Sequence, residues 1–301
     1  MNSEFKDVMI VAIYEWRDAY RSKRAALWFI LYLIMSMVVC YSFVITVEKI
    51  ESELAKTVNL GTTQRAGNMT ASLWESQAFK RILEKLVGDE KLAEKLTQTP
   101  PMAIFYGWLA MAFTPFLVIL LASESLSSEL SNGTVRFALF RTSRSAWVVG
   151  KAIGQWILLL LALLLSAAGA WIIGRFWMVG FDGVVAARFL VLFMVKAWIY
   201  SFAFIGITFG FSQLTRSIAL SRALAVIGFM AVFILHHIAN HFAGPGIRKL
   251  WEIVVILMPP AHRIGFWHYE TAKIVSSISF SIGLGFLYLF AGYLVFRRKD
   301  L

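Results

Sequence analysis

The sequence has few charged residues and almost no cysteine. Only 16% of its 301 residues are Asp, Glu, Lys or Arg, whereas 59% are hydrophobic and the mean hydropathy is +0.69. A soluble domain of this length carries roughly a quarter charged residues. The single cysteine, Cys40, cannot form an intrachain disulfide, and its apolar surroundings are those of a small core side chain. The apolar surplus predicts a protein that crosses a membrane several times.

The sequence also lacks the short motifs that identify many enzymes. A G-x-x-x-x-G-K-[ST] phosphate loop is absent, because Gly150-Lys151 is followed by Ala152 and the upstream glycine is missing. H-E-x-x-H, G-x-S-x-G and the Cys/His spacings of zinc sites are absent as well. We therefore expect no catalytic residue and no cofactor in this chain, and uphill work would need an external energy source.

Six long apolar runs dominate the sequence, and each has about the 20 residues that a membrane-spanning helix needs. They predict an all-α membrane protein with one transmembrane domain over residues 1–301. The predicted spans are residues 25–47, 102–122, 152–173, 189–211, 218–238 and 274–296.

Three further segments lie outside these spans. Residues 5–24 have apolar positions at helical spacing and a basic rim, which predicts an amphipathic helix in the membrane interface. The alternative is a soluble-type helix packed on a partner. Residues 48–101 form a long, electrically balanced extracytoplasmic segment. Within residues 239–273, the apolar stretch Leu250–Met258 is too short to cross and predicts a short external re-entrant or interfacial helix.

The net charge of +11 is unevenly distributed along the chain. The two tails and residues 123–151 and 213–222 together hold 14 Lys and Arg, whereas the two shorter loops on the other side hold six. Since Lys and Arg in short loops collect on the cytoplasmic side, both termini are predicted to be cytoplasmic in a cell (inner) membrane. The positive charge therefore does not indicate a nucleic-acid partner.

Residues 123–151 form a polar, basic island between the second and third spans. The second span is expected to continue as a helix through Ser131. Asn132-Gly133 then supplies left-handed backbone that ends the helix, and Thr134 is expected to cap a new short helix, Val135–Phe140.

Two aromatic side chains on that short helix share one face, because Phe137 and Phe140 are three residues apart. Arg136, Arg141 and Arg144 surround them. One interpretation is a plug for a groove in a partner protein. The other is an interfacial loop whose aromatic rings enter lipid and whose arginines contact phosphates.

The island resembles the signature of ABC-2 type transporter permeases. The resemblance lies in Glu129, Gly133-Thr134, the hydrophobic Val135–Phe140, Ser143-Arg144 and Gly150-Lys151. Where that family usually has a proline before the Ser-Arg pair, this chain has Thr142.

The resemblance implies a transmembrane subunit of an exporter that pairs with a second copy of itself in the lipid membrane. It further implies two copies of a separate ABC ATPase, which would bind the ATP and Mg. The segment after Gly-Thr would be the coupling helix that fits a cleft in the ATPase. The residues implied to couple to the ATPase are Glu129, Gly133, Thr134, Val135, Arg136, Phe137, Phe140, Arg141 and Arg144.

A few polar residues in or near the spans are further candidates. Lys196, about seven residues into the fourth span, either lines a substrate path or extends its ammonium to the headgroups. Arg222 is expected to snorkel or to pair with Glu124 or Glu129. His237 and His241 are four residues apart, a weak metal-ligand spacing. The permease branch linked to nitrous-oxide reductase maturation makes a metal role there conceivable, although interfacial histidines are the simpler interpretation.

Two other functions remain open at the level of sequence. The chain could be a membrane scaffold that passes ATPase motion to an extracytoplasmic protein through residues 48–101, without moving a solute. A secondary transporter would need broken helices and inverted repeats, for which Pro115 is the single hint. The transported substrate does not follow from the sequence.

Overall fold

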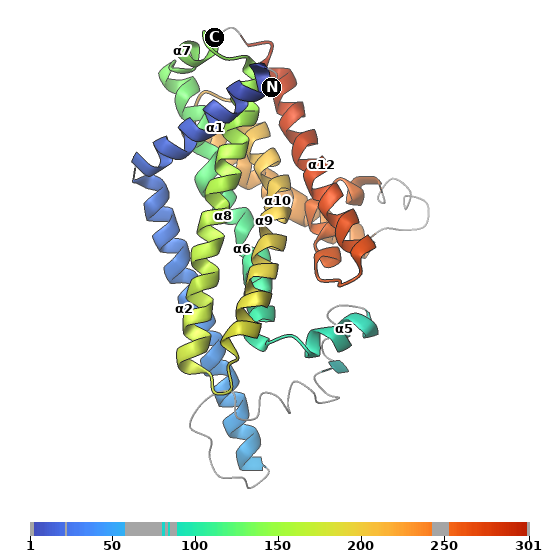
Figure 1. Ribbon diagram of the computed structural model, residues 1–301. Coiled ribbons are helices and arrows are strands. Elements are labelled where there is room, and N and C mark those ends of the chain that lie inside the picture. Colours follow the sequence, from blue (N-terminus) through green and yellow to red (C-terminus); the bar gives the residue numbers. More distant parts are fainter. Residues whose placement is uncertain are drawn as a thin grey trace. The chain divides into compact units, whose positions relative to one another are not determined.

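The computed structural model describes residues 3–21, 23–57, 80–81, 84, 89–242 and 253–299, and none of these forms a strand. The helices, labelled in Figure 1, are α1 (Ser3–Arg21), α2 (Arg24–Thr57), α5 (Glu90–Thr97), α6 (Pro101–Asn132), α7 (Val135–Leu139), α8 (Arg144–Trp177), α9 (Gly183–Ser212), α10 (Ile218–Phe242) and α12 (Thr271–Phe296). Short 3-10 helices cover Pro259–His262 and Ile264–Phe266.

Six helices are long and apolar enough to cross a membrane. The candidate spans are Ala25–Glu53, Pro101–Asn132, Arg144–Trp177, Gly183–Ser212, Ile218–Ile238 and Thr271–Phe296. The predicted all-α class with six membrane-spanning helices is confirmed. Several helices are longer than the apolar runs. In particular α6 ends at Asn132 and α8 begins at Arg144, so most of the polar island continues these two helices.

The segments between the spans are described in part. The long 48–101 segment contains the end of α2 and the short helix α5, whose Leu92, Ala93 and Leu96 are buried. Most of the region between these two helices lies outside the described residues. Of the predicted short helix Leu250–Met258, residues 253–256 are helical, and its beginning also lies outside the described residues.

The chain divides into two compact units. Unit 1 comprises Met1–Trp28, Phe113–Leu161 and Trp198–Leu301. In this unit Trp156 and Trp198 stack with their ring centres 4.1 Å apart, and each indole N–H donates to the other residue's carbonyl. α9 and α12 approach closely, because a Cβ at Gly206 would lie 2.2 Å from the Gly285 carbonyl oxygen. Glycine at such points lets two backbones touch in a lipid environment.

Unit 2 comprises Phe29–Ala112 and Ala162–Ala197. Two buried polar contacts in it cross between helices: the hydroxyls of Ser36 and Ser166 are 2.8 Å apart, and the Tyr106 hydroxyl donates to the Leu163 carbonyl at 3.0 Å. These bonds satisfy groups that would be costly to leave unpaired in an apolar interior. Apart from Lys196, the candidate functional residues lie in unit 1.

Candidate functional site

The short helix α7 presents two large apolar side chains to the surface. Phe137 is 75% exposed and Phe140 is 86% exposed, and Arg136 and Arg141 are exposed beside them. Gly133 has a φ of 70°, the left-handed backbone that ends α6 and turns the chain into α7. The helix is attached to the rest of unit 1 by Val135, which is buried.

The expected capping role of Thr134 is wrong. Its backbone is already helical (φ −66°, ψ −21°), and its side chain makes no capping hydrogen bond. The hydroxyl instead donates back to the carbonyl of Glu129 at 3.5 Å, because the tight turn at Gly133 directs it toward the end of α6. The helix also ends one residue earlier than expected, at Leu139, with Phe140 as its C-cap.

Arg144 does not belong to the exposed basic rim. Its guanidinium donates to the carbonyls of Arg297 at 2.8 Å and Lys299 at 3.1 Å, and more weakly to that of Phe296 at 3.4 Å. The last carbonyls of a helix have no partner within it, and Arg144 supplies one for the end of α12. Trp147 reinforces this contact by stacking on Phe296, with ring centres 5.6 Å apart.

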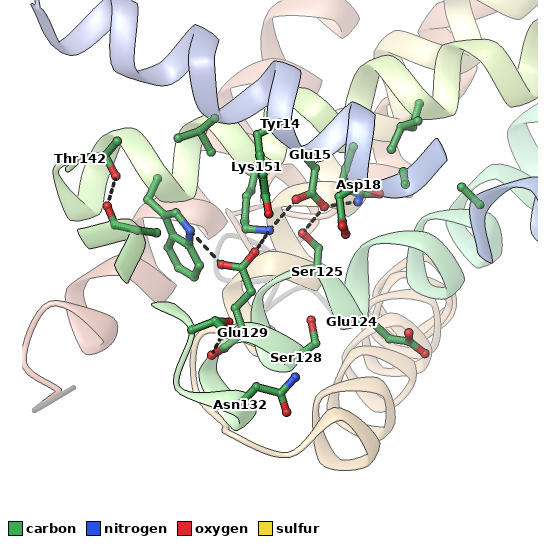
Figure 2. Close-up of a pocket in the computed structure, with 18 of the residues that line it drawn as sticks. Tyr14, Glu15, Asp18, Glu124, Ser125, Ser128, Glu129, Asn132, Thr142 and Lys151 are labelled. Atoms are coloured by element: carbon green, nitrogen blue, oxygen red, sulfur yellow. Dashed lines mark hydrogen bonds and ion pairs between the residues drawn. The ribbon is translucent and has the colours of Figure 1, made fainter. Parts of the chain in front are cut away.

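A buried charge cluster joins α1, α6 and α8 (Figure 2). The Lys151 ammonium lies 2.5 Å from a carboxylate oxygen of Glu15 and 2.8 Å from one of Glu129. The side chains of Lys151 and Glu15 are only 4% and 7% exposed, and that of Glu129 is 23% exposed. A single cation therefore holds two carboxylates from two other helices.

Both carboxylates accept further hydrogen bonds. Glu15 Oε1 accepts from the Ser125 hydroxyl at 2.6 Å and from the Gln155 amide at 2.7 Å. Glu129 accepts from the Trp147 indole N–H at 3.2 Å. Burial alone would raise the pKa of the Glu15 carboxyl, but the Lys151 ammonium and the two donors outweigh that effect. The pKa of Glu15 consequently lies below its ordinary value of 4.5, and the group is ionised at neutral pH.

Two glycines on α8 allow α1 to approach closely enough for this cluster. A Cβ at Gly150 would lie 2.7 Å from both the Val8 carbonyl oxygen and the Val11 Cβ. A Cβ at Gly154 would lie 2.8 Å from the Glu15 Cβ. The spacing of four residues puts both glycines on one face of α8, next to Lys151.

α1 has two different faces. Val11, Ala12 and Glu15 are buried, whereas a broad apolar side remains exposed. The exposed apolar residues are Phe5, Met9, Ile10, Ile13, Tyr14, Trp16 and Tyr20. An exposed apolar side next to the start of a membrane span is the pattern of an interfacial helix. The helix therefore packs on α8 through one face and has a second face available for lipid.

A cavity of about 1240 Å³ opens beside this cluster, within unit 1 (Figure 2). Its walls come from α1, the end of α6, α7 with the turn after it, and the start of α8. The polar lining residues labelled in Figure 2 are Tyr14, Glu15, Asp18, Glu124, Ser125, Ser128, Glu129, Asn132, Thr142 and Lys151. Glu124 also forms an ion pair with Arg222, which identifies Glu124 rather than Glu129 as the partner of that arginine.

One known protein family matches nearly the whole chain. The family model described as ABC-2 family transporter protein matches residues 9–301. The chain belongs to this family. No curated protein matches the sequence. Membership identifies a multi-pass transmembrane permease subunit of an ABC transporter and implies a partner ATPase and a lipid environment. The match does not single out the branch linked to nitrous-oxide reductase maturation.

Other residues of this ABC-2 subunit that the sequence singled out are not members of the charge cluster. Lys196, in unit 2, is 5% exposed, and its ammonium lies 5.5 Å from the ring centre of Phe193. A snorkelling lysine has an exposed ammonium, so that interpretation does not fit. His237 lies near the end of α10, and the side chain of His241 falls outside the described residues. Within the described ranges no three His, Cys, Asp or Glu side chains form a metal-binding group.

Sequence reasoning missed most of the charge cluster. It named Glu129 as a coupling residue and Lys151 as the start of the third span, but not Glu15, Ser125 or Gln155. Two signals were available: a carboxylate on the apolar stripe of an amphipathic helix, and the G-x-x-x-G pattern at Gly150 and Gly154. Neither identifies its partner helix, which only the fold reveals.

Proposed function

We propose that this ABC-2 family subunit is an exporter permease that docks a separate ATPase through α7. The observation that carries the proposal is the exposure of Phe137 on the five-residue helix α7 and of Phe140 at its C-cap, in a segment that joins two long helices. Burying one phenylalanine side chain in a partner's groove gains roughly 1.5–3 kcal/mol. Two such anchors with basic neighbours form a compact protein-binding surface.

The motion would pass from α7 into the membrane through continuous helices. α7 is joined to α6 by the turn at Gly133 and to α8 by the few residues before Arg144. Because α6 and α8 are continuous helices of 32 and 34 residues, a displacement of α7 would be passed along them, with Pro115 as a point where α6 can bend. ATP and Mg would bind to two partner ATPase subunits, and a second copy of this chain would complete the export path.

The buried charge cluster would make α1 and the coupling segment move together. Lys151 on α8 binds both Glu129, on the last turn of α6, and Glu15, on α1. A helix held by one buried cation and two close glycine contacts follows its neighbour when that neighbour moves. In this proposal Glu129 and Arg144 act within the subunit, and the ATPase is contacted by Phe137, Phe140, Arg136 and Arg141.

The docking surface is tested by co-purification of the partner ABC ATPase with this chain from detergent-solubilised membranes. The Phe137→Asp/Phe140→Asp variant should retain at least tenfold less ATPase, because two apolar anchors are lost and two charges would be buried without partners. Tyr20→Asp, which changes an 84% exposed aromatic on α1, should retain wild-type amounts and serves as the matched control.

Undiminished ATPase binding by the double variant would refute α7 as the coupling helix. If the wild-type complex hydrolyses ATP in response to an extracytoplasmic protein but exports nothing, the chain is instead a transmitter of ATPase motion to that protein.

A further inference from the structure

The cavity beside the charge cluster is large for a site with no assigned ligand. Its volume of about 1240 Å³ exceeds the roughly 300–1000 Å³ of most small-molecule sites. The coupling proposal uses Phe137 and Phe140 at its rim but leaves the cavity itself without a role.

The lining changes from apolar to polar along the helices that form it. Leu120 and Leu121 on α6 and Leu158 on α8 belong to the predicted membrane spans, and Trp28 of α2 lies beside them in the lining. The wall on α6 continues to Asn132, about 18 Å further along the helix axis. Asp18, Glu124 and Glu129 line the polar part. A molecule that fits both parts has a polar head and an apolar chain.

The charges select the head group. Asp18 is exposed, and the side chains of Glu124 and Glu129 are 25% and 23% exposed, so all three carboxylates can be reached. Lys151 is buried and already holds two carboxylates, which leaves Arg141 as the accessible cation of the lining. Beneath the cluster, Gln155 Oε1 has no hydrogen-bond partner in the part of the chain that the structure describes. Because Glu124 is paired with Arg222 and Glu129 with Lys151, Asp18 is the carboxylate best placed to neutralise an ammonium group, and Arg141 suits one phosphate.

We propose that this cavity binds a zwitterionic phospholipid with a primary ammonium head, phosphatidylethanolamine. The ammonium lies among Asp18, Glu124 and Glu129, the phosphate meets Arg141, and an acyl chain follows Leu121 and Leu158. Such a lipid would fill the space between α1 and α7 and make their arrangement depend on membrane composition. The cavity shares Arg141, Phe137 and Phe140 with the proposed docking surface, but lipid binding needs no partner protein and is tested on this chain alone.

The test is photo-crosslinking of the purified full-length chain in nanodiscs. Phosphatidylethanolamine or phosphatidylglycerol, each with a diazirine on its acyl chain, is irradiated in the disc, and crosslinked peptides are mapped by mass spectrometry. We expect the ethanolamine lipid to mark the peptides that contain residues 10–19 and 120–128 at least fivefold more than the glycerol lipid. Asp18→Asn should reduce this labelling about fivefold, since an exposed ion pair contributes up to roughly 1 kcal/mol.

Matched variants separate binding from damage to the fold. Leu121→Trp should abolish the labelling by filling the apolar part, whereas Leu161→Trp, at an exposed position of α8 outside the cavity, should not. Asp7→Asn on α1, also outside the cavity, is the control for Asp18→Asn. Each variant is compared only if it is monodisperse and retains its helical circular dichroism.

Equal labelling by the two lipids, or labelling that Leu121→Trp leaves unchanged, would overturn the proposal. So would crosslinks between the ATPase and the cavity walls in a complex that carries no lipid crosslink there, because the cavity would then hold a segment of the partner.

Discussion

At the scale of single residues, Lys151 is the buried cation that balances the charge of two carboxylates. It lies between Glu15 and Glu129, and its side chain is 4% exposed. Moving these three charges out of water costs desolvation free energy. The attraction between them offsets that free energy only while all three side chains are present. Removal of Lys151 therefore leaves two carboxylates facing each other in a poorly hydrated site.

We predict that Lys151→Met releases α1 and destabilises the subunit by about 3 kcal/mol, because it leaves a buried carboxylate uncompensated. The measurement is trypsin cleavage at Arg21 and Lys23, between α1 and α2, together with denaturation in mixed micelles. Lys91→Met, at an exposed position of α5, is the control and should change neither quantity.

A second variant distinguishes charge from packing. Glu15→Gln added to Lys151→Met removes the uncompensated buried charge, so the double variant should be more stable than Lys151→Met alone. Equal or greater destabilisation of the double variant would contradict the electrostatic explanation.

Residue roles near this cluster were only partly predictable. Arg144 has the position in the sequence of a basic rim residue, and it forms a cap for α12 because the end of a helix more than 150 positions away lies beside it. A short helix that contains Phe137 was predicted from local spacing, although Phe140 is the C-cap of that helix and not part of it. Properties set by spacing can be derived from sequence, whereas partners set by tertiary contact cannot.

At the scale of elements, the α1–α8 contact depends on backbone proximity. Gly150 and Gly154 have no side chain to hold the helices apart, and Val8, Val11 and Glu15 occupy the space a Cβ would need. The apolar stripe of residues 5–24 correctly predicted a helix but could not show which side of it meets protein. Aromatic residues are on the exposed side, and Val11, Ala12 and Glu15 are on the packed side.

We expect Gly150→Ala to weaken α1 docking by about 1–3 kcal/mol, because the new methyl group overlaps the Val8 carbonyl oxygen and must push the helix away. Gly283→Ala on α12 is the control, since nothing lies within 4 Å of a Cβ there. That change should be neutral or should stabilise by up to about 1 kcal/mol through helix propensity. Equal tryptic release of α1 in both variants would show that the close approach is not required.

At the scale of the whole molecule, the number of spans was derivable because apolar runs of membrane length have few alternatives. The ends of the helices could not be derived from the sequence, because polar residues of the island extend α6 and α8 beyond the apolar runs. Family membership rests on the whole chain, whereas the motif that suggested it occupies the island. The orientation of the spans is still a prediction from charge.

This orientation can be measured by cysteine labelling in intact cells. Cys40 is fully buried, so the unaltered chain should not react with a membrane-impermeant maleimide. α8, with 34 residues, separates Phe140 from Val179 by a full membrane span. Val179→Cys should therefore react in intact cells, and Phe140→Cys should react only after the membrane is opened. The reverse pattern would place the termini outside the cytoplasm.

The hydrogen bonds from Arg144 to carbonyls at and just after the end of α12 have a consequence for experimental design. Since these carbonyls belong to Phe296, Arg297 and Lys299, an affinity tag or fluorescent protein joined closely behind Lys299 would start beside the α7–α8 junction. Such a fusion would crowd the surface on which the ATPase is proposed to bind. A reporter fused at this end would interfere with the binding that it is meant to measure, and a long spacer avoids the problem.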